Sequence, residues 1–396
     1  MKKLLVIAAG LLQIPVIKKA RKMGYYVIAA DGNNKAPGLH FANKSVVIDI
    51  TSESEMLDLA QKNEIDGVIH PCSEVSMNVM GRINDELHLH GISYATAICA
   101  TNKHLMRQSF EACGAPSPKS FCTDKEEEGW SLFELLGGKV ILKPSRNSGS
   151  RGIAEIEPGT DRETFTVLFD RAKHESRDSS VMVEQFVEGP EFSVEIIVWN
   201  SKINVLQVTD KKTTEAPYFV ELGHNQPSLF PVEVVECVKD AAVRGVKALG
   251  LNDCAAHAEV KVQNGEAYLM EIGARLGGDF ISTELTHLSS GIDMVAAAIN
   301  VALGIEPDLT PKSAPQGVAI RYFTPNPGRV AAIENKKVLR RPDVYDYDIY
   351  VKPGDEVREV KSSLDRSGHV IVTAPTAKEA IKIAEELIST IKIITE

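Results

Sequence analysis

The first hundred residues alternate between short apolar runs and segments in which apolar positions have helical spacing. Residues 3–9 (KLLVIAA), 25–31 (YYVIAAD), 45–50 (SVVIDI) and 66–71 (DGVIHP) are the apolar runs. Continuous apolar runs bounded by turn residues are typical of parallel strands that helices cover on both faces. We therefore predict a doubly wound, parallel α/β sheet over residues 1–101.

Asp31 ends the second apolar run, where dinucleotide-binding domains of oxidoreductases carry an acidic residue for the ribose hydroxyls. The first run, however, is followed by residues 9–14 (AGLLQI), which hold one glycine. The pattern G-x-G-x-x-G is needed for the backbone to approach a pyrophosphate closely. We therefore favour a structural role for Asp31 and keep nicotinamide binding as the weaker alternative.

Net charge and cysteine usage narrow the class of protein. The chain has 44 Lys and Arg against 54 Asp and Glu, so a basic face for nucleic acid is not expected. Its six cysteines are scattered, without a C-x-x-C pair or a Cys/His cluster. The longest apolar run, residues 4–17, contains Gln13 and Pro15 and is shorter than the about 18 residues of a membrane span. We predict a cytoplasmic protein with reduced thiols and neither nucleic acid nor membrane as a partner.

The middle of the chain, residues 102–310, is rich in strand patterns. A short apolar strand, residues 140–143, ends in Lys143 and is followed by a Ser/Gly-rich loop over residues 145–152. An ammonium group beside unhindered backbone N–H groups suits a polyphosphate, although the order differs from a P-loop and an ordinary loop is the alternative. Glu184 lies among apolar neighbours in residues 181–186, where its carboxylate needs either a salt-bridge partner or a ligand.

Residues 255–272 form two alternating strands around Asn264 and Gly265. A two-residue turn would place Glu271 on the apolar face. A three-residue loop, residues 264–266, gives every apolar residue on one face an apolar partner, pairing Ala258 with Ile272, Val260 with Met270, and Val262 with Tyr268. We therefore predict the three-residue loop, which places Glu259 directly opposite Glu271.

Two carboxylates in directly opposed positions are destabilising unless a positive group lies between them. A divalent cation with hard oxygen ligands, Mg²⁺ or Mn²⁺, is one solution, and pairing with Arg, Lys or solvent is the other. Arg275 follows Glu271 by four residues and precedes Gly277 and Gly278. Its guanidinium group would suit a carboxylate or a transferring phosphoryl group, and an ordinary surface arginine is the alternative.

Taken in order, five pieces of the sequence resemble one family. They are Lys103, Lys143, the loop 145–152, residues 183–195 (VEQFVEGPEFSVE), and the hairpin continuing into YLMEIGARLGGD. Together they resemble the ATP-grasp superfamily, particularly carboxylate-amine ligases such as L-amino acid ligases, with biotin carboxylase and carbamoyl phosphate synthase as more distant relatives. The resemblance implies a pre-ATP-grasp domain at 1–101, an ATP-grasp domain of two sheets clamping ATP at 102–310 with a lid at 115–187, and a C-terminal α+β segment at 311–396.

The resemblance also implies roles for individual residues. Those assigned to ATP are Lys103 and Lys143 at the phosphates, Ser148, Gly149 and Ser150 over the γ-phosphate, Glu184 and Val187 at adenine, and Glu191 at the ribose. Glu259 and Glu271 are implied as Mg²⁺ ligands, and Arg275 as the group that stabilises an acyl phosphate. Many relatives have an asparagine where this chain has Gly273, so the metal is expected to have fewer protein ligands here.

The activity implied is ATP-dependent joining of a carboxylate to an amine, amino acids included, through an acyl phosphate, with release of ADP and phosphate. Alternatives within the superfamily are a bicarbonate-activating carboxylase and a purine-pathway ligase acting on a phosphoribosylamine. A non-catalytic nucleotide-binding module and a nicotinamide enzyme are the alternatives outside it. The expected partners are small-molecule carboxylates and amines, and a homodimer through the first domain is compatible with the resemblance.

Some further segments have less specific patterns. Residues 210–224 mix charged and aromatic side chains, which predicts an irregular segment serving as a binding loop or a surface excursion. His224 in this segment and Arg321 on a later strand are further candidates for holding an anionic group. In the C-terminal segment, residues 365–369 are predicted as a turn and residues 376–391 as a helix.

Overall fold

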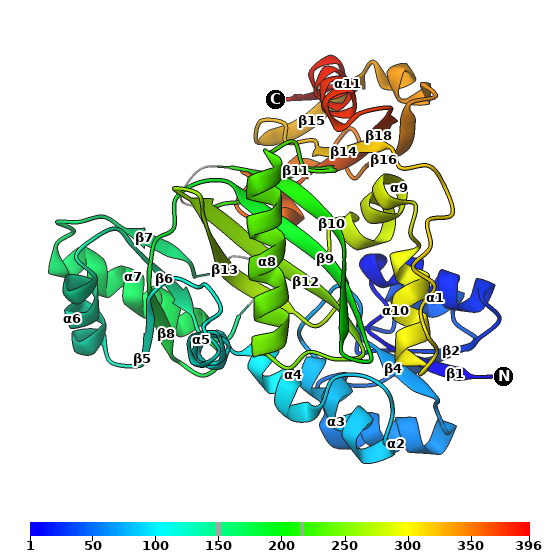
Figure 1. The fold of residues 1–396 in the computed structure, drawn as a ribbon. Coiled ribbons are helices and arrows are strands. Elements are labelled where there is room, and N and C mark those ends of the chain that lie inside the picture. Colours follow the sequence, from blue (N-terminus) through cyan, green and yellow to red (C-terminus); the bar gives the residue numbers. More distant parts are fainter. Residues whose placement is uncertain (148–151, 215–217) are drawn as a thin grey trace.

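The computed structural model describes residues 1–147, 152–214 and 218–396. Its first part is a four-stranded parallel sheet of order β3-β2-β1-β4, which confirms the predicted α/β arrangement (Figure 1). The strands are β1 Lys3–Ile7, β2 Tyr26–Asp31, β3 Lys44–Val47 and β4 Gly67–Ile69. The helices of this part and of the connection after it are α1 Ile14–Lys22, α2 Glu53–Asn63, α3 Met77–Leu87, α4 Tyr94–Thr101 and α5 Lys103–Ala112.

Asp31 has a structural role at the end of β2. Its Oδ2 accepts a hydrogen bond from the backbone N–H of Ala9 at 2.7 Å, and its Oδ1 accepts one from the N–H of Asn33 at 2.7 Å. The carboxylate thus holds the loops that follow the two central strands.

A second sheet lies in a lobe that projects from the rest of the molecule (Figure 1). It has the order β5-β8-β6-β7, and all its pairs are antiparallel. Its elements are β5 Ser120–Thr123, α6 Glu126–Leu136, β6 Val140–Pro144, β7 Ala154–Ile156, α7 Arg162–Glu175 and β8 Val181–Gln185. Phe133, Phe165 and Phe169 of the two helices form the core of the lobe against β6 and β8. The lobe therefore has its own hydrophobic core.

The largest sheet has eight strands in the order β13-β12-β9-β10-β11-β14-β18-β16. Its strands are β9 Glu191–Trp199, β10 Lys202–Thr213, β11 Glu221–Gln226, β12 Cys254–Gln263, β13 Glu266–Gly273, β14 Gly317–Tyr322, β16 Val344–Ile349 and β18 Gly368–Ala374. Strands that follow residue 310 therefore continue the sheet that begins at β9.

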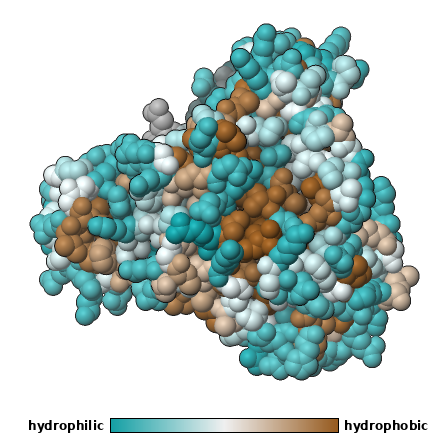
Figure 2. All heavy atoms as spheres, in the orientation of Figure 1, coloured by the Kyte–Doolittle hydropathy of each residue, from teal (hydrophilic) through white to brown (hydrophobic). Residues whose placement is uncertain are grey.

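Helices cover this sheet and fill the space between it and the first sheet. They are α8 Val232–Ala248, α9 Thr286–Ser290, α10 Met294–Ala302 and α11 Ala377–Thr390. α11 confirms the helix predicted near the C-terminus. A small third sheet, order β17-β15-β19, consists of β15 Gly328–Glu334, β17 Glu356–Val357 and β19 Lys392–Thr395. Figure 2 shows an apolar patch over the strands beside α8. Ile203 and Val205 of β10 are partly buried and pack against the main hydrophobic core.

The predicted loop of the β12–β13 hairpin is wrong, although the predicted pairing of the two glutamates is right. The turn has two residues, Asn264 at φ 54° and Gly265 at φ 83°, as a type I′ turn requires. The register then shifts at a bulge, because Val260 pairs with Leu269 whereas Glu259 pairs with Glu271. Met270 is therefore the extra residue of a β-bulge. The bulge shifts the register by one residue and so places Glu259 opposite Glu271, which the two-residue turn alone would not have done.

The prediction for residues 210–224 is wrong at both ends of that segment. β10 continues through Thr213 and β11 begins at Glu221, so its flanks are paired strands. The turn predicted at 365–369 is partly correct, since a short 3₁₀ helix covers Ser363–Asp365 and β18 begins at Gly368.

In the part of the chain that the structure describes, no helix is long and apolar enough to cross a membrane. All six cysteines lie in that part and are free thiols.

Candidate active site

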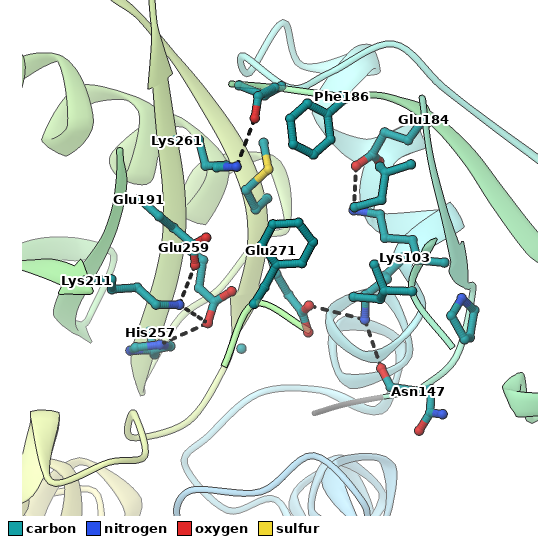
Figure 3. Close-up of a pocket in the computed structure, with 18 of the residues that line it drawn as sticks. Lys103, Asn147, Glu184, Phe186, Glu191, Lys211, His257, Glu259, Lys261 and Glu271 are labelled. Atoms are coloured by element: carbon teal, nitrogen blue, oxygen red, sulfur yellow. Dashed lines mark hydrogen bonds and ion pairs between the residues drawn. The ribbon is translucent and has the colours of Figure 1, made fainter. Parts of the chain in front are cut away.

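A pocket lies between the lobe sheet and the eight-stranded sheet (Figure 3). The structure brings together at this pocket eight of the residues predicted from the sequence: Lys103, Lys143, Glu184, Val187, Glu191, Glu259, Glu271 and Arg275. Ser148, Gly149 and Ser150, predicted to cover the γ-phosphate, lie outside the described residues. The described predicted residues therefore share one site although they come from elements far apart in the sequence.

Glu184 and Lys143 form a buried ion pair on adjacent strands of the lobe. Lys143 Nζ lies 2.5 Å from Glu184 Oε1, and Arg107 Nε lies 2.8 Å from Glu184 Oε2. Burial raises the pKa of Glu184, but Arg107 and Lys143 more than offset this, so its pKa is lowered. An adenine amino group would therefore have to share this carboxylate with two cations. Arg107 was missed in the sequence, although it follows Lys103 by four residues on α5 and so lies on the same helix face.

Lys103 is the first residue of α5 and joins the two sides of the pocket. Its Nζ donates to the carbonyl of Asn147 at 2.9 Å and lies 3.2 Å from Glu271 Oε2 (Figure 3). Its backbone N–H donates to the carbonyl of Ser145 at 3.0 Å. Burial lowers the pKa of Lys103, but the nearby Glu271 and Glu74 more than offset this. The pKa is therefore raised, and the lysine stays protonated. A cation is therefore fixed between the loop after β6 and the predicted metal ligand.

Glu259 and Glu271 point into the pocket from adjacent strands (Figure 3). Burial is the largest cause that raises the pKa of Glu271, and the nearby Glu74 and Glu259 raise it as well; Lys103 and Arg275 act in the opposite direction, but the pKa is still raised. This excess of negative charge is what a divalent cation would relieve. Within residues 1–147, 152–214 and 218–396, no group of three or more His, Cys, Asp or Glu side chains is arranged to hold a metal. Two carboxylates completed by phosphate oxygens and water are a donor set that suits Mg²⁺.

Lys211 lies beside this pair and is surrounded by carboxylates. Its Nζ contacts Glu191, lies 3.3 Å from Glu259 and 3.7 Å from Glu221, and its side chain is 4% exposed. Burial lowers the pKa of Lys211, but the three glutamates raise it well above its usual value. Lys211 was not among the residues predicted from the sequence to form a site. The strand alternation of β10, had it been recognised, would have placed Lys211 and Lys212 on opposite faces.

Arg275 connects the eight-stranded sheet to the first domain. Its Nη2 lies 2.7 Å from Oε1 of Glu74, in the segment after β4. Burial raises the pKa of Glu74, but Arg275 and Lys103 more than offset this, so its pKa is lowered. Arg275 is therefore held in place by a carboxylate, Glu74, that was not predicted from the sequence.

Val187 was predicted to lie at the adenine ring. Its carbonyl oxygen accepts a hydrogen bond from the Nζ of Lys261 at 2.9 Å.

The two weaker candidates bind other protein groups. His224 is buried, and its Nε2 lies 3.3 Å from Oδ2 of Asp279. The guanidinium group of Arg366 binds both oxygens of Asp279, at 2.6 and 2.8 Å, and lies over the ring of Tyr322. Arg321 donates from Nε to Glu385 of α11 at 2.6 Å. Arg321 thus connects β14 of the eight-stranded sheet to α11, whereas His224 and Arg366 bind the same carboxylate, Asp279.

Arg366 and Ser363 bring the C-terminal segment to the wall of the pocket. Arg366 Nη1 donates to the carbonyl of Glu221 at 3.2 Å, and Ser363 Oγ donates to Glu221 Oε2 at 2.9 Å. Because Glu221 lines the pocket, the C-terminal segment contacts the pocket wall through this one residue in the part of the chain that the structure describes.

Comparisons with known families agree with this arrangement. A model of the ATP-grasp domain matches residues 136–284, which include the lobe and the β12–β13 hairpin. The chain thus contains an ATP-grasp domain, and its parallel first sheet followed by antiparallel sheets is the arrangement of the ATP-grasp fold. The model of L-amino acid ligase C-terminal domain 2 matches residues 321–396, so the protein also carries the C-terminal domain of those ligases.

Similar proteins include both relatives in sequence and solved structures. An uncharacterized protein of Sinorhizobium fredii, y4rH, is 26% identical over 79% of this chain and 65% of its own length. The alanine–anticapsin ligase of Bacillus subtilis is 27% identical over 60% of this chain and 54% of its own length. The chain thus spans between half and two thirds of these two proteins. The L-amino acid ligase of Bacillus licheniformis has a TM-score of 0.85 at 20% identity, over 100% of this chain and 99% of that one, which shows a shared fold.

Proposed function

We propose that this protein is an ATP-dependent ligase that joins a carboxylate to an amine through an acyl phosphate and releases ADP and phosphate. The observation that carries the proposal is the opposed pair Glu259 and Glu271 in a pocket that also holds Lys103, Lys143 and Arg275. Phosphoryl transfer depends mainly on positioning and on neutralising the charge that spreads over the transferred group. The two carboxylates would position a metal ion, and the two lysines and the arginine would neutralise the charge of the transferred group.

The chemistry needs activation because a carboxylate is a poor electrophile. Transfer of the γ-phosphoryl group from ATP to a carboxylate oxygen forms an acyl phosphate and releases ADP. The amine then attacks the carbonyl carbon, the new C–N bond replaces the C–O bond to phosphate, and the amine loses a proton. Arg275 would face the oxyanion of this second step, and the lobe would exclude water from the acyl phosphate.

The nucleotide roles assigned to this pocket use groups on both sheets. Lys143 and Lys103 would bind phosphate oxygens, Glu184 and Val187 would lie at adenine, and Glu191 would bind the ribose. The segment with Ser148, Gly149 and Ser150 would close over the γ-phosphate. Lys211 would neutralise carboxylates beside the nucleotide.

Glu259 and Glu271 would hold Mg²⁺ together with nucleotide phosphates and water. The metal, when bound, would supply charge neutralisation at those phosphates. Gly273 contributes no side-chain oxygen, so the protein's share of the ligands rests on the two carboxylates.

Phosphate release from the purified protein tests the proposal. The assay contains ATP and Mg²⁺ with amino acids singly and in pairs, and in a separate series bicarbonate. We expect release that requires two amino acids, with a product whose mass equals their sum less one water. Release driven by bicarbonate alone would overturn the ligase proposal in favour of a carboxylase.

Replacing Lys143 by methionine is expected to weaken ATP binding about 30-fold, because a charge-assisted bond to phosphate contributes about 2 kcal/mol. The fold should survive, since Arg107 still neutralises Glu184. Calorimetric titration with ATP measures the dissociation constant. Lys139→Met is the matched control, because Lys139 precedes the same strand but pairs with Glu155 and Glu157. An unchanged dissociation constant in K143M would remove Lys143 from the nucleotide site.

A further inference from the structure

A buried carboxylate lies behind Glu259, on the neighbouring strand β9. Glu195 is 0% exposed, and one of its oxygens contacts Nδ1 of His257, the residue paired with it across β9 and β12. The other ring nitrogen of His257, Nε2, lies 3.6 Å from Oε1 of Glu259. Figure 3 shows the imidazole beside Glu259, on the side away from Glu271. Glu195 is therefore one side chain removed from a proposed metal ligand.

The second oxygen of Glu195 connects to the loop that follows Arg275. Ser282 donates its hydroxyl hydrogen to this oxygen, and Ser282 Oγ accepts from the backbone N–H of Gly277 at 2.6 Å. Gly277 lies two residues after Arg275. The same carboxylate thus connects, through two different partners, to a proposed metal ligand and to the loop that carries the proposed catalytic arginine.

The loop backbone packs directly on this pair. A Cβ atom at position 277 would lie 2.5 Å from Nδ1 of His257 and 3.1 Å from Oε1 of Glu195. Such a contact is too short for the imidazole, which lies between Glu195 and Glu259. The absence of a side chain at Gly277 is therefore a requirement of the close packing between the loop and the buried pair.

A buried carboxylate is costly unless it is paired and hydrogen-bonded, and replacing such a group by an apolar one is often neutral or stabilising. Glu195 therefore needs a reason beyond stability. Groups that bind a metal ligand from behind set its orientation, and their loss commonly reduces metal affinity by about 10-fold to 100-fold.

We propose that Glu195 is a positioning residue, which orients Glu259 through His257 and fixes the Gly277 loop through Ser282. Glu195 thereby fixes the position of the proposed metal ligand, Glu259, relative to the loop that carries Arg275. This inference rests on the proposed function, because it takes Glu259 as a metal ligand.

The test is the affinity of the ADP complex for Mn²⁺, measured by calorimetry and by the electron paramagnetic resonance of free Mn²⁺. Glu195→Gln keeps the volume but removes the charge, and we expect Mn²⁺ affinity to fall about 10-fold. The matched control is Ser289→Ala, another buried serine with two side-chain partners, Gln207 and Gln226, which should leave the affinity unchanged. ADP affinity without metal should be unchanged in both variants.

Two further variants keep the outcome unambiguous. His257→Gln breaks the same connection and carries the test if E195Q does not fold, as judged by thermal unfolding. Glu259→Gln reports on the metal site itself. Wild-type Mn²⁺ affinity in folded E195Q or H257Q, with E259Q weakened, would overturn the positioning role and leave the proposed function standing. Wild-type affinity in E259Q would instead overturn the metal assignment and the inference with it.

Discussion

Replacing Glu271 by glutamine is expected to lower ADP formation by about three orders of magnitude while the protein stays folded. The loss is of the size seen when a group that stabilises transition-state charge is removed, because the metal would keep one carboxylate ligand in place of two. The fold is expected to survive, since the substitution keeps the volume and removes a charge that lies near Glu74 and Glu259. A coupled assay of ADP release measures the effect.

Glu266→Gln is the matched control for this variant. Glu266 begins the same strand, is exposed, and binds only the hydroxyl of Tyr268 among the side-chain contacts that the structure describes. Its turnover should be within about twofold of wild type, as surface substitutions rarely have larger effects. Turnover at the wild-type level in E271Q would remove Glu271 from the proposed metal site.

Replacing Asp279 by alanine is expected to lower the free energy of unfolding by about 3 to 5 kcal/mol, because the substitution leaves a buried guanidinium group unpaired. Arg366 is 9% exposed at its side chain, and Asp279 binds two of its nitrogens. His224 loses its partner in the same variant. Urea unfolding followed by circular dichroism measures the change.

The exposed pair of Asp308 and Lys312 supplies the control. Both side chains are more than half exposed, so Asp308→Ala should change stability by about 0.5 kcal/mol or less. A loss in D279A no larger than in D308A would contradict the assignment of Asp279 as a structural anchor.

The Asp279 pair also predicts a dependence of stability on pH. Burial raises the pKa of Asp279, but Arg366 and His224 more than offset this. The pKa of Asp279 is therefore well below its usual range. The pair therefore stabilises the fold fully above the pH of about 4 at which an unfolded aspartate ionises, and its contribution is lost as pH falls below that value. Unfolding measured between pH 3 and 6 should show a smaller acid-side decline in D279A than in wild type.

Much of the fold could be predicted from the sequence because the relevant signals are local. The apolar runs of the first domain and the spacing of α11 each lie within one element. The strand at residues 210–213 was missed because its consecutive charged residues, of which Lys211 lines the pocket, break the apolar alternation that marks a buried strand. The bulge at Met270 was missed because both registers place apolar residues opposite one another.

Residues that line the candidate pocket could be predicted where the resemblance supplied residue types in order, and not where a residue binds a partner distant in sequence. Arg107 binds Glu184 across 77 positions of sequence, and Glu74 binds Arg275 across 201. No periodic pattern connects such positions, because it is the docking of whole elements that brings them together. Glu195 is a further case, because the sequence shows it only as a single acidic position within a largely apolar strand.

The course of the eight-stranded sheet bears on any attempt to recombine this protein with its relatives. Strand β14, from the part of the chain after residue 310, pairs directly with β11, whose Glu221 lines the pocket. Arg366 reaches from that part to Asp279 and to the carbonyl of Glu221. A chimera that exchanges the C-terminal segment to change substrate preference would therefore break one ladder and one ion pair at the pocket wall. Residues 221, 279 and 366 should be inherited from the same parent.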